Sequence, residues 1–229
     1  MKYKTLLFDA DDTLLDFHRA ESAALTDTLT KHGLPCTPDI IRIYSEINDS
    51  LWKALERGEI EKDKLRVVRF ERFCEELGFS ADPNGLAQTY MECLSTKPYV
   101  FDGAIELCRE LSKHYRMYIV TNGLKTIQTR RFAQSGLAPY FEKSFISEDS
   151  GFEKPDARYF EWATAQIPEF DPNTTLVIGD SLTSDMKGGI NFGLDTCWYN
   201  PKQKTAPQDL ELTYTVHGFD ELGRLLMPV

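Results

Sequence analysis

Two aspartates, Asp9 and Asp11, stand at the end of the apolar run 4–9 and could carry chemistry. Polar residues able to bind a metal or a phosphate recur at or just beyond the ends of later apolar runs. They are Thr121 with Asn122, Lys154, and Asp180 with Asp185. Ligands of an open parallel sheet bind outside the carboxyl ends of its strands. We therefore expect these side chains to meet at one site.

The aspartates of this group predict a bound divalent cation. Two carboxylates about 4 Å apart repel each other by about 4 kcal/mol at an effective dielectric constant of about 20. Three or more of them around one point therefore need a cation. Oxygen ligands of this kind, with room left for water, suit Mg²⁺.

The Asp9 carboxylate is the expected nucleophile, because it is already ionised at neutral pH and can attack phosphorus without an activating base. That attack forms an aspartyl phosphate. Asp11 is placed to protonate the leaving alkoxide and later to deprotonate the attacking water. Thr121 and Asn122, with neighbouring backbone N–H groups, could bind phosphoryl oxygens. Lys154 could balance the charge on the nucleophile and the phosphoryl group, so the pattern predicts phosphoryl transfer.

The short apolar runs that precede these residues alternate with helical stretches. Such alternation predicts an α/β fold with a doubly wound, Rossmann-like parallel sheet that is covered on both faces. The expected strands occupy residues 4–9, 117–122, 144–148, 175–180 and 196–200, with a short edge strand near 214–218. The expected helices between them include residues 103–114, 124–136 and 156–166.

Residues 17–97 break this alternation and contain no convincing buried strand. Apolar residues recur there with the period of a helix. The expected helices are 19–32, 38–57, 61–77 and 83–95, with breaks at residues 33–35, Gly58 and Gly78. We therefore expect an all-helical cap at 17–97, inserted into an α/β catalytic core formed by residues 1–16 and 98–229.

The ordered motifs resemble those of the haloacid dehalogenase-like (HAD) hydrolases over essentially the whole chain. The helical insertion is similar to the C1-type cap of that family. The matching segments are DADDTL at 9–14, TNG at 121–123, KPD at 154–156 and GDSLTSD at 179–185.

This resemblance implies roles for the individual residues. Asp9 would be the nucleophile and Asp11 the general acid and base, while Thr121 and Lys154 would bind the phosphoryl group. The Mg²⁺ ligands would be Asp9, the backbone carbonyl of Asp11 and Asp180, with Asp185 supporting them from behind.

A closer resemblance is to the noncanonical pyrimidine nucleotidase branch of the family. It is carried by FDADDTLLDF at 8–17, SEDSGFEKPDARYF at 147–160, and residues of the expected cap. It implies a 5′-nucleotidase that acts on pyrimidine nucleoside monophosphates, including odd or damaged ones. Asp12 stands where glycine is common in the wider family, and this branch is compatible with an acidic residue there. We expect the nucleotide to be contacted by Phe17, Asn48, Trp52 and Arg69.

Other activities on the same scaffold remain open at this point. A sugar-phosphate phosphatase or a phosphomutase would share all four motifs. A dehalogenase needs neither Mg²⁺ nor the second aspartate, so Asp11 and Asp180 argue against it. A receiver domain also forms an aspartyl phosphate, but it lacks a helical cap and carries its phosphorylated aspartate in mid-chain.

Several of these residues also have plain structural interpretations. The loop after Asp9 does not fit a calcium loop, because Leu14 replaces the required glycine and Ala20 the bidentate glutamate. The Lys154 segment could simply begin a helix with proline in its first turn. Asp185 could simply cap a helix. Trp52 in the cap could equally belong to a helix core, and Arg69 could be solvated or paired with a carboxylate.

The composition limits the choice of partners. A net charge of −10 argues against binding long nucleic acid, whereas a small phosphorylated metabolite such as a nucleoside monophosphate remains compatible. No apolar run reaches the length of a membrane span, and the first residues lack the apolar centre of a signal peptide. The five scattered cysteines show no zinc spacing. We therefore expect a cytoplasmic protein with reduced thiols and no membrane partner.

Overall fold

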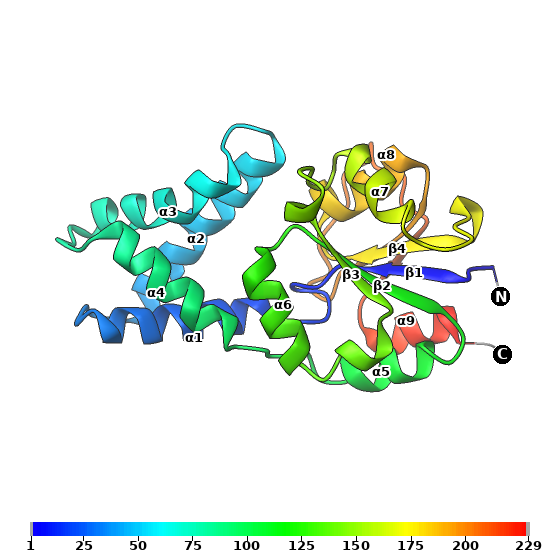
Figure 1. The fold of residues 1–229 in the computed structure, drawn as a ribbon, viewed down its shortest axis with the longest axis horizontal. Coiled ribbons are helices and arrows are strands. Elements are labelled where there is room, and N and C mark those ends of the chain that lie inside the picture. Colours follow the sequence, from blue (N-terminus) through cyan, green and yellow to red (C-terminus); the bar gives the residue numbers. More distant parts are fainter. Residues whose placement is uncertain (1, 228–229) are drawn as a thin grey trace. The chain divides into compact units, whose positions relative to one another are not determined.

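The computed structural model describes residues 2–227, which divide into two compact units (Figure 1). The described parts of Met1–Asp16 and Tyr99–Val229 make up one, here called the α/β unit. Phe17–Pro98 makes up the other, here called the helical unit. The division therefore falls after residues 16 and 98, where we expected it after residues 16 and 97.

The ends of the expected core, at residues 1–16 and 98–229, include Met1, Pro228 and Val229. These three residues lie outside the described part of the chain.

The α/β unit contains a six-stranded sheet in the order β3-β2-β1-β4-β5-β6. All neighbouring strands run parallel, and β1 pairs with β2 on one side and with β4 on the other. The predicted doubly wound parallel sheet is thus confirmed, including the short edge strand. The strands are β1 (Thr5–Phe8), β2 (Arg116–Thr121), β3 (Lys143–Ile146), β4 (Thr175–Gly179), β5 (Asp195–Tyr199) and β6 (Tyr214–Val216).

Helices cover both faces of this sheet. In Figure 1, α5 and α9 lie together on one side of the strands, and α7 and α8 lie on the other. The helices are α5 (Ala104–Leu111), α6 (Lys125–Gln134), α7 (Ala157–Thr164), α8 (Lys187–Phe192) and α9 (Phe219–Leu226).

The central strand β1 is buried on both faces. Leu6 and Phe8 belong to one apolar cluster, whereas Leu7 belongs to the cluster on the opposite face, because successive side chains of a strand point to opposite sides. A parallel strand between two helical layers therefore favours apolar residues on both faces, which explains the run of Leu6, Leu7 and Phe8.

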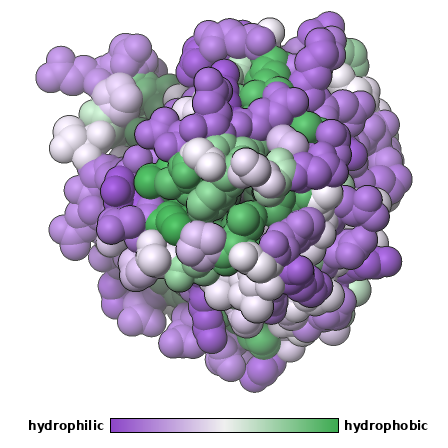
Figure 2. Space-filling view, turned by 90° about the vertical axis from the view of Figure 1, so that its left-hand side faces the viewer, coloured by the Kyte–Doolittle hydropathy of each residue, from purple (hydrophilic) through white to green (hydrophobic). Residues whose placement is uncertain are grey.

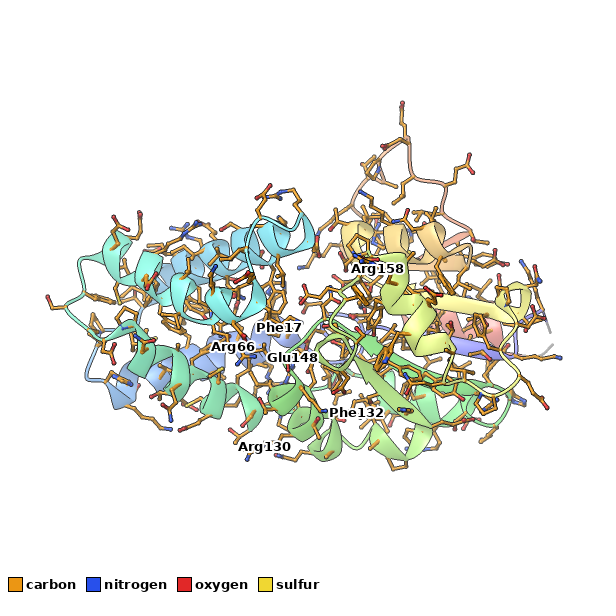
Figure 3. All side chains as sticks on the ribbon, turned by 45° about the horizontal axis from the view of Figure 1, so that its top comes forward. Phe17, Arg66, Arg130, Phe132, Glu148 and Arg158 are labelled. Atoms are coloured by element: carbon orange, nitrogen blue, oxygen red, sulfur yellow. The ribbon has the colours of Figure 1, made fainter. Side chains whose placement is uncertain are left out.

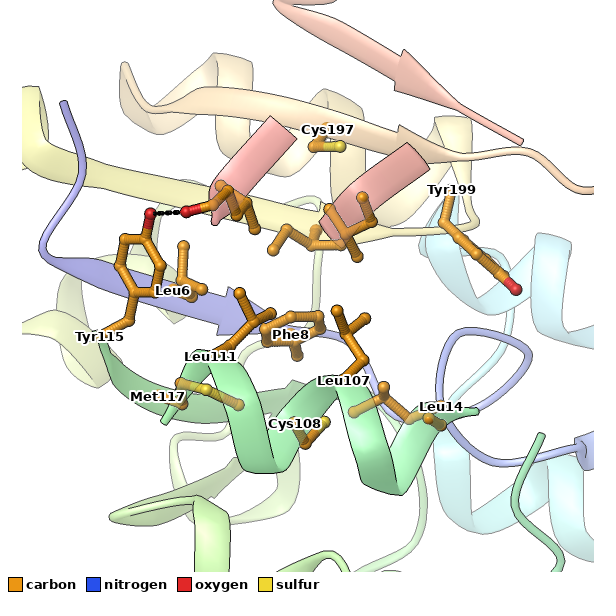
Figure 4. Close-up of a cluster of buried hydrophobic side chains, with 14 of the residues drawn as sticks. Leu6, Phe8, Leu14, Leu107, Cys108, Leu111, Tyr115, Met117, Cys197 and Tyr199 are labelled. Carbon is orange, nitrogen blue, oxygen red and sulfur yellow. Dashed lines mark hydrogen bonds between the residues drawn. The ribbon is translucent and has the colours of Figure 1, made fainter. Parts of the chain in front are cut away.

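Figure 4 shows the cluster between β1 and α5, with Leu107 and Leu111 of the helix near Phe8 of the strand. Burying one such side chain stabilises the fold by about 1.5–3 kcal/mol. The hydroxyl of Tyr115 donates a hydrogen bond to the carbonyl of Leu226 in α9. This layer holds β1 in place and so fixes where its carboxyl end lies.

The segments that leave and re-enter the α/β unit lie side by side. The N–H of Asp16 donates to the carbonyl of Tyr99 at 3.0 Å, and the N–H of Phe101 donates to the carbonyl of Leu14 at 3.0 Å. The insertion is therefore attached through two adjacent, hydrogen-bonded segments.

The helical unit folds into four helices, and no strand is assigned between Phe17 and Pro98. Thr37 and Asp82 cap two of the helices by accepting hydrogen bonds from backbone N–H groups of the first turn. Gly78 ends another in the left-handed conformation, with φ of 65°, that glycine adopts without strain. The helices are α1 (Phe17–Lys31), α2 (Pro38–Glu56), α3 (Lys62–Leu77) and α4 (Pro83–Ser95).

The face shown in Figure 2 is mostly polar, with apolar surface gathered near its centre. Among the described residues, no helix combines the length and the apolar character that a membrane span requires. The expected cytoplasmic location stays a prediction.

Candidate active site

The carboxyl ends of three adjacent strands carry the predicted site residues. Asp9 follows β1, Thr121 ends β2 and Asp180 follows β4. Since β2, β1 and β4 are neighbours in the sheet, residues that are 59 to 171 positions apart in the chain meet at one edge. This is the edge at which open α/β sheets bind ligands.

Lys154 lies at the centre of this group and is fully enclosed, with 1% of its surface exposed. Its Nζ donates to Asp9 Oδ1 at 2.7 Å, to Asp185 Oδ1 at 2.5 Å and to the carbonyl of Val120 at 2.8 Å. Burial acts to lower the pKa of Lys154, but the facing carboxylates of Asp185 and Asp9 outweigh it and raise that pKa above its usual range. Lys154 is therefore a buried cation shared by two carboxylates.

Asn122 positions the backbone of Lys154. Its Oδ1 accepts from the N–H of Lys154 at 2.9 Å, and its Nδ2 donates to the carbonyl of Lys154 at 2.9 Å. Both polar atoms of the Asn122 side chain thus bond to the backbone of Lys154, and its predicted contact with the phosphoryl group stays a prediction. Asp156 caps α7, so Pro155 precedes that helix and does not stand in its first turn.

Asp185 lies in a π-helical turn, Leu182–Met186, directly after β4. The hydroxyl of Ser181, and not Asp185, caps this turn by accepting from the N–H of Ser184 at 3.2 Å. The interpretation of Asp185 as a helix cap is therefore wrong. Its carboxylate accepts from the N–H of Ser181 at 3.1 Å as well as from Lys154.

The carboxylates of Asp9, Asp180 and Asp185 form a compact group whose oxygens lie within 4.8 Å of one another. Burial and the charge of Asp185 raise the pKa of Asp9 to about 8, although Lys154 acts against them, so the expected ionisation of Asp9 at neutral pH needs a further cation nearby. Burial and the charges of Asp9 and Asp185 also raise the pKa of Asp180 well above its usual range. The single positive charge of Lys154 does not balance the three carboxylates of this group. The group therefore fits a divalent cation, which prefers oxygen ligands.

Gly179, the first residue of the GDSLTSD segment, makes room for Asp185. A Cβ atom at position 179 would lie 2.3 Å from Asp185 Oδ2 and 2.7 Å from its Cβ. The side chain of Asp185 packs directly over the end of β4, so only glycine fits there.

We expect Gly179→Ala to displace Asp185 and to weaken Mg²⁺ binding by about 10-fold, because groups that support metal ligands contribute on that scale. The rise in the thermal unfolding midpoint caused by added Mg²⁺ should shrink accordingly. Gly218→Ala is the control, since a Cβ there meets no atom within 4 Å. An unchanged Mg²⁺ titration in Gly179→Ala would show that Asp185 does not support the metal site.

Asp11 is held by two residues of α6 that sequence reasoning missed. Gln128 Nε2 donates to its Oδ2 at 2.7 Å, and Arg131 Nη1 donates to its Oδ1 at 2.5 Å. The sequence did contain a sign of this pair. A glutamine and an arginine stand three residues apart among the inward-facing positions of a helix. The hydroxyl of Thr13, another residue given no role in advance, donates to Asp9 Oδ2 at 3.4 Å.

Two of the expected nucleotide contacts, Asn48 and Arg69, lie inside the helical unit, with 0% and 2% of their surfaces exposed. Asn48 Nδ2 donates to Glu21 Oε1 at 2.8 Å, and its Oδ1 accepts from Arg69 Nη1 at 3.2 Å. The guanidinium of Arg69 lies 4.7 Å from the centre of the Tyr90 ring. Both side chains therefore lie in the interior of the bundle, and their predicted contact with the nucleotide stays a prediction.

We expect Asn48→Ala to lower the free energy of unfolding by about 3 kcal/mol, because it removes two hydrogen bonds to buried charged groups. Urea denaturation followed by far-UV circular dichroism would measure this loss. Lys53→Ala, at an exposed position of the same helix, should change stability little. A raised KM with unchanged stability would instead support the predicted contact with substrate.

The two remaining residues predicted to contact the nucleotide are half-buried. Phe17 begins α1 (Figure 3). Trp52 of α2 packs against the apolar cluster of Leu51, Leu55 and Leu65. Their predicted contact with the nucleotide stays a prediction.

Comparison with known proteins agrees with this geometry. A model of the haloacid dehalogenase-like hydrolases matches residues 3–193. The pyrimidine 5′-nucleotidase PynA of Streptococcus pneumoniae is 43% identical over 223 residues, which cover 97% of this chain and 94% of PynA. The pyrimidine 5′-nucleotidase YjjG of Escherichia coli is 31% identical over 226 residues, or 99% of each chain.

A solved structure is also similar over the full length. The crystal structure of the HAD-hydrolase YfnB of Bacillus subtilis, bound to magnesium, is 42% identical and covers 99% of both chains with a TM-score of 0.94. The resemblance predicted from the four motifs is thereby confirmed, and the chain belongs to the haloacid dehalogenase-like hydrolase family.

Proposed function

We propose that the protein is a Mg²⁺-dependent phosphomonoester hydrolase that works through an aspartyl phosphate on Asp9. The observation that carries this proposal is the buried Lys154, which bonds to Asp9 and Asp185 beside the partly exposed Asp180. Such a cluster combines a carboxylate nucleophile, a fixed cation for a phosphate and oxygen ligands for a metal.

Asp9 and Asp180 would hold Mg²⁺, together with the backbone carbonyl of Asp11. Asp185 would support them, because its carboxylate is already bonded to Lys154 and Ser181. When bound, Mg²⁺ would neutralise the carboxylates and the phosphate and so let two anionic groups approach each other.

The protein's own residues carry both halves of the reaction. An oxygen of Asp9 attacks phosphorus, the new phosphorus–oxygen bond forms, and the ester bond breaks. Asp11 gives its proton to the departing alkoxide. In the second half Asp11 takes a proton from water, the water oxygen bonds to phosphorus, and the bond to Asp9 breaks to release inorganic phosphate.

The residues around Asp9 would stabilise the transferring group. Lys154 is already within hydrogen-bond distance of the nucleophile, where it can offset charge on the phosphoryl oxygens. Thr121 is buried at the end of β2, and its hydroxyl can donate to one of those oxygens. Fixed donors of this kind need little reorganisation during the reaction.

The proposed substrates are pyrimidine nucleoside monophosphates, noncanonical ones included. Support comes from PynA and YjjG, which are named as pyrimidine 5′-nucleotidases. The helical unit would act as a cap that excludes water during transfer. Phe17 and Trp52 are the aromatic residues we propose for contact with the base, and Asn48 and Arg69 are the polar residues we propose for contact with the nucleotide.

A phosphate-release screen with and without Mg²⁺ tests this proposal. We expect UMP, dUMP and dTMP to be hydrolysed faster than sugar phosphates, and chelation of the metal to abolish the release. Equal or faster release from sugar phosphates would refute the nucleotidase assignment and leave the hydrolase assignment standing. Isomerisation of a sugar phosphate without phosphate release would identify a phosphomutase instead.

A further inference from the structure

Two buried side chains of α6, Gln128 and Arg131, have no part in the mechanism described above. We propose that Gln128, oriented by Arg131, is a positioning residue that directs both the Asp11 carboxylate and the Thr121 hydroxyl. This inference rests on the proposed function, which gives Asp11 and Thr121 their roles.

The Asp11 carboxylate is held at both oxygens. Gln128 Nε2 donates to Oδ2 at 2.7 Å and Arg131 Nη1 to Oδ1 at 2.5 Å. The Arg131 side chain is 0% exposed, whereas that of Asp11 is 27% exposed. A carboxylate offers about four acceptor positions. These two contacts therefore fix the plane of the group and leave a position on each oxygen for the proton that it transfers.

The Thr121 hydroxyl is directed by the same amide. Its oxygen accepts from Gln128 Nε2 at 3.0 Å and from the N–H of Gly123 at 3.1 Å. A hydroxyl oxygen has two acceptor lone pairs and one O–H. With both lone pairs occupied, Thr121 has its O–H left to donate. A phosphoryl oxygen is a hydrogen-bond acceptor, so this arrangement presets Thr121 for it.

Arg131 determines which way the Gln128 amide points. Its Nη1 also donates to Gln128 Oε1 at 3.3 Å. A reversed amide would set Oε1 against the Asp11 carboxylate and lose both donations from Nε2. Residues three positions apart lie on one face of a helix, so α6 presents the two side chains together.

Gly123 provides the space for this arrangement. A Cβ atom at position 123 would lie 2.3 Å from Gln128 Nε2 and 2.6 Å from its Cγ. Gly123→Ala would therefore push Gln128 away from Asp11 and Thr121 without altering either residue. It provides a second, independent way to disturb the same contacts.

The test compares two esters in Gln128→Glu, which keeps the size of the side chain but replaces its donor by an acceptor. An alkyl ester such as dUMP needs a proton on its leaving oxygen, whereas p-nitrophenyl phosphate releases a stable anion. The ratio kcat/KM depends only on the steps up to the first irreversible one. Later hydrolysis of the aspartyl phosphate therefore does not affect it. Competitive inhibition by inorganic phosphate reports separately on Thr121.

We expect Gln128→Glu to lower kcat/KM for dUMP by about 100-fold, the scale of a misplaced catalytic group. For p-nitrophenyl phosphate the loss should be about 10-fold or less, and inhibition by phosphate should weaken. Gly123→Ala should act in the same directions. Arg130→Lys is the control, because Arg130 is an exposed residue of the same helix (Figure 3), and it should stay within about 2-fold.

An equal loss with both esters and unchanged inhibition by phosphate would overturn the proposal, because a merely structural defect lowers the active fraction for every substrate alike. If Gln128→Glu lacks the circular dichroism spectrum of the folded protein, Gly123→Ala decides alone. A wild-type enzyme that cleaves sugar phosphates and not dUMP refutes only the nucleotidase assignment, and a sugar phosphate then serves as the alkyl ester. A wild-type protein that cleaves neither class of ester refutes the proposed function and this role with it.

Discussion

Asp9→Asn should abolish turnover, with a loss in kcat of at least about 10⁴-fold, the scale seen when a catalytic nucleophile is removed. An amide of the same size cannot attack phosphorus as a carboxylate does. The fold should persist, because the substitution adds no volume beside the buried Phe8 and Ala10 and leaves Asp185 as the charged partner of Lys154. The measurement is phosphate release, together with acid-quench trapping of a phosphorylated protein, which only the wild type should yield.

Asp12→Asn is the matched control for this variant. Asp12 lies in the same loop with φ of 56°, a conformation that asparagine also tolerates. Its turnover should remain within about 10-fold of the wild type, which is about 1.4 kcal/mol in activation free energy, because Asp12 is not one of the proposed reacting groups and asparagine keeps the size of the side chain. Substantial phosphatase activity in Asp9→Asn, with no change in the trapped species, would remove Asp9 from the role of nucleophile.

Lys154→Met should cause the second large loss, in both activity and stability. The substitution keeps much of the side-chain volume but leaves Asp9 and Asp185 without the cation that bonds to both. Removing one partner of a buried ion pair costs about 3–5 kcal/mol in the free energy of unfolding. We expect kcat/KM to fall by about 10²–10³-fold, as for the loss of one fixed donor at a reacting group.

Urea denaturation with and without Mg²⁺ would measure the stability change. Added Mg²⁺ should restore part of the lost stability in Lys154→Met, because a bound cation offsets the same carboxylates. Lys187→Met is the control, since Lys187 is exposed at the start of α8. Equal unfolding midpoints in the two variants would show that Lys154 does not neutralise the buried cluster.

The chemistry of the strand ends was predictable because it depends on local order along the chain. Polar residues end or directly follow buried strands at Asp9, Thr121 and Asp180. Parallel strands bring such ends to one edge of a sheet. Once the alternation of strands and helices is recognised, the meeting of these residues follows from the topology.

The supporting contacts were not predictable in the same way. Gln128 and Arg131 reach Asp11 across the space between a helix and a neighbouring strand end. Gly179 matters because a Cβ would collide with Asp185. Both facts depend on side-chain direction and on distances of a few ångströms, which spacing along the chain does not contain.

The helical unit shows most clearly which contacts a sequence pattern does not reveal. Its four helices are evident from the apolar period, yet Asn48 and Arg69 were expected at a ligand and lie in the interior. A helical pattern identifies an apolar face, but it does not tell whether a polar residue on that face meets solvent, a ligand or another buried polar group. Here Glu21 supplies the partner, 27 positions away from Asn48.

The sequence by itself therefore determined the fold class, the family and the pair of carboxylates, Asp9 and Asp11, because backbone periodicity and strand ends are local properties. Tertiary structure alone decided how those carboxylates are held: Asp9 by Lys154, and Asp11 by Gln128 and Arg131. The reason is physical. Hydrogen-bond direction and steric fit arise only when elements distant in the chain pack against one another.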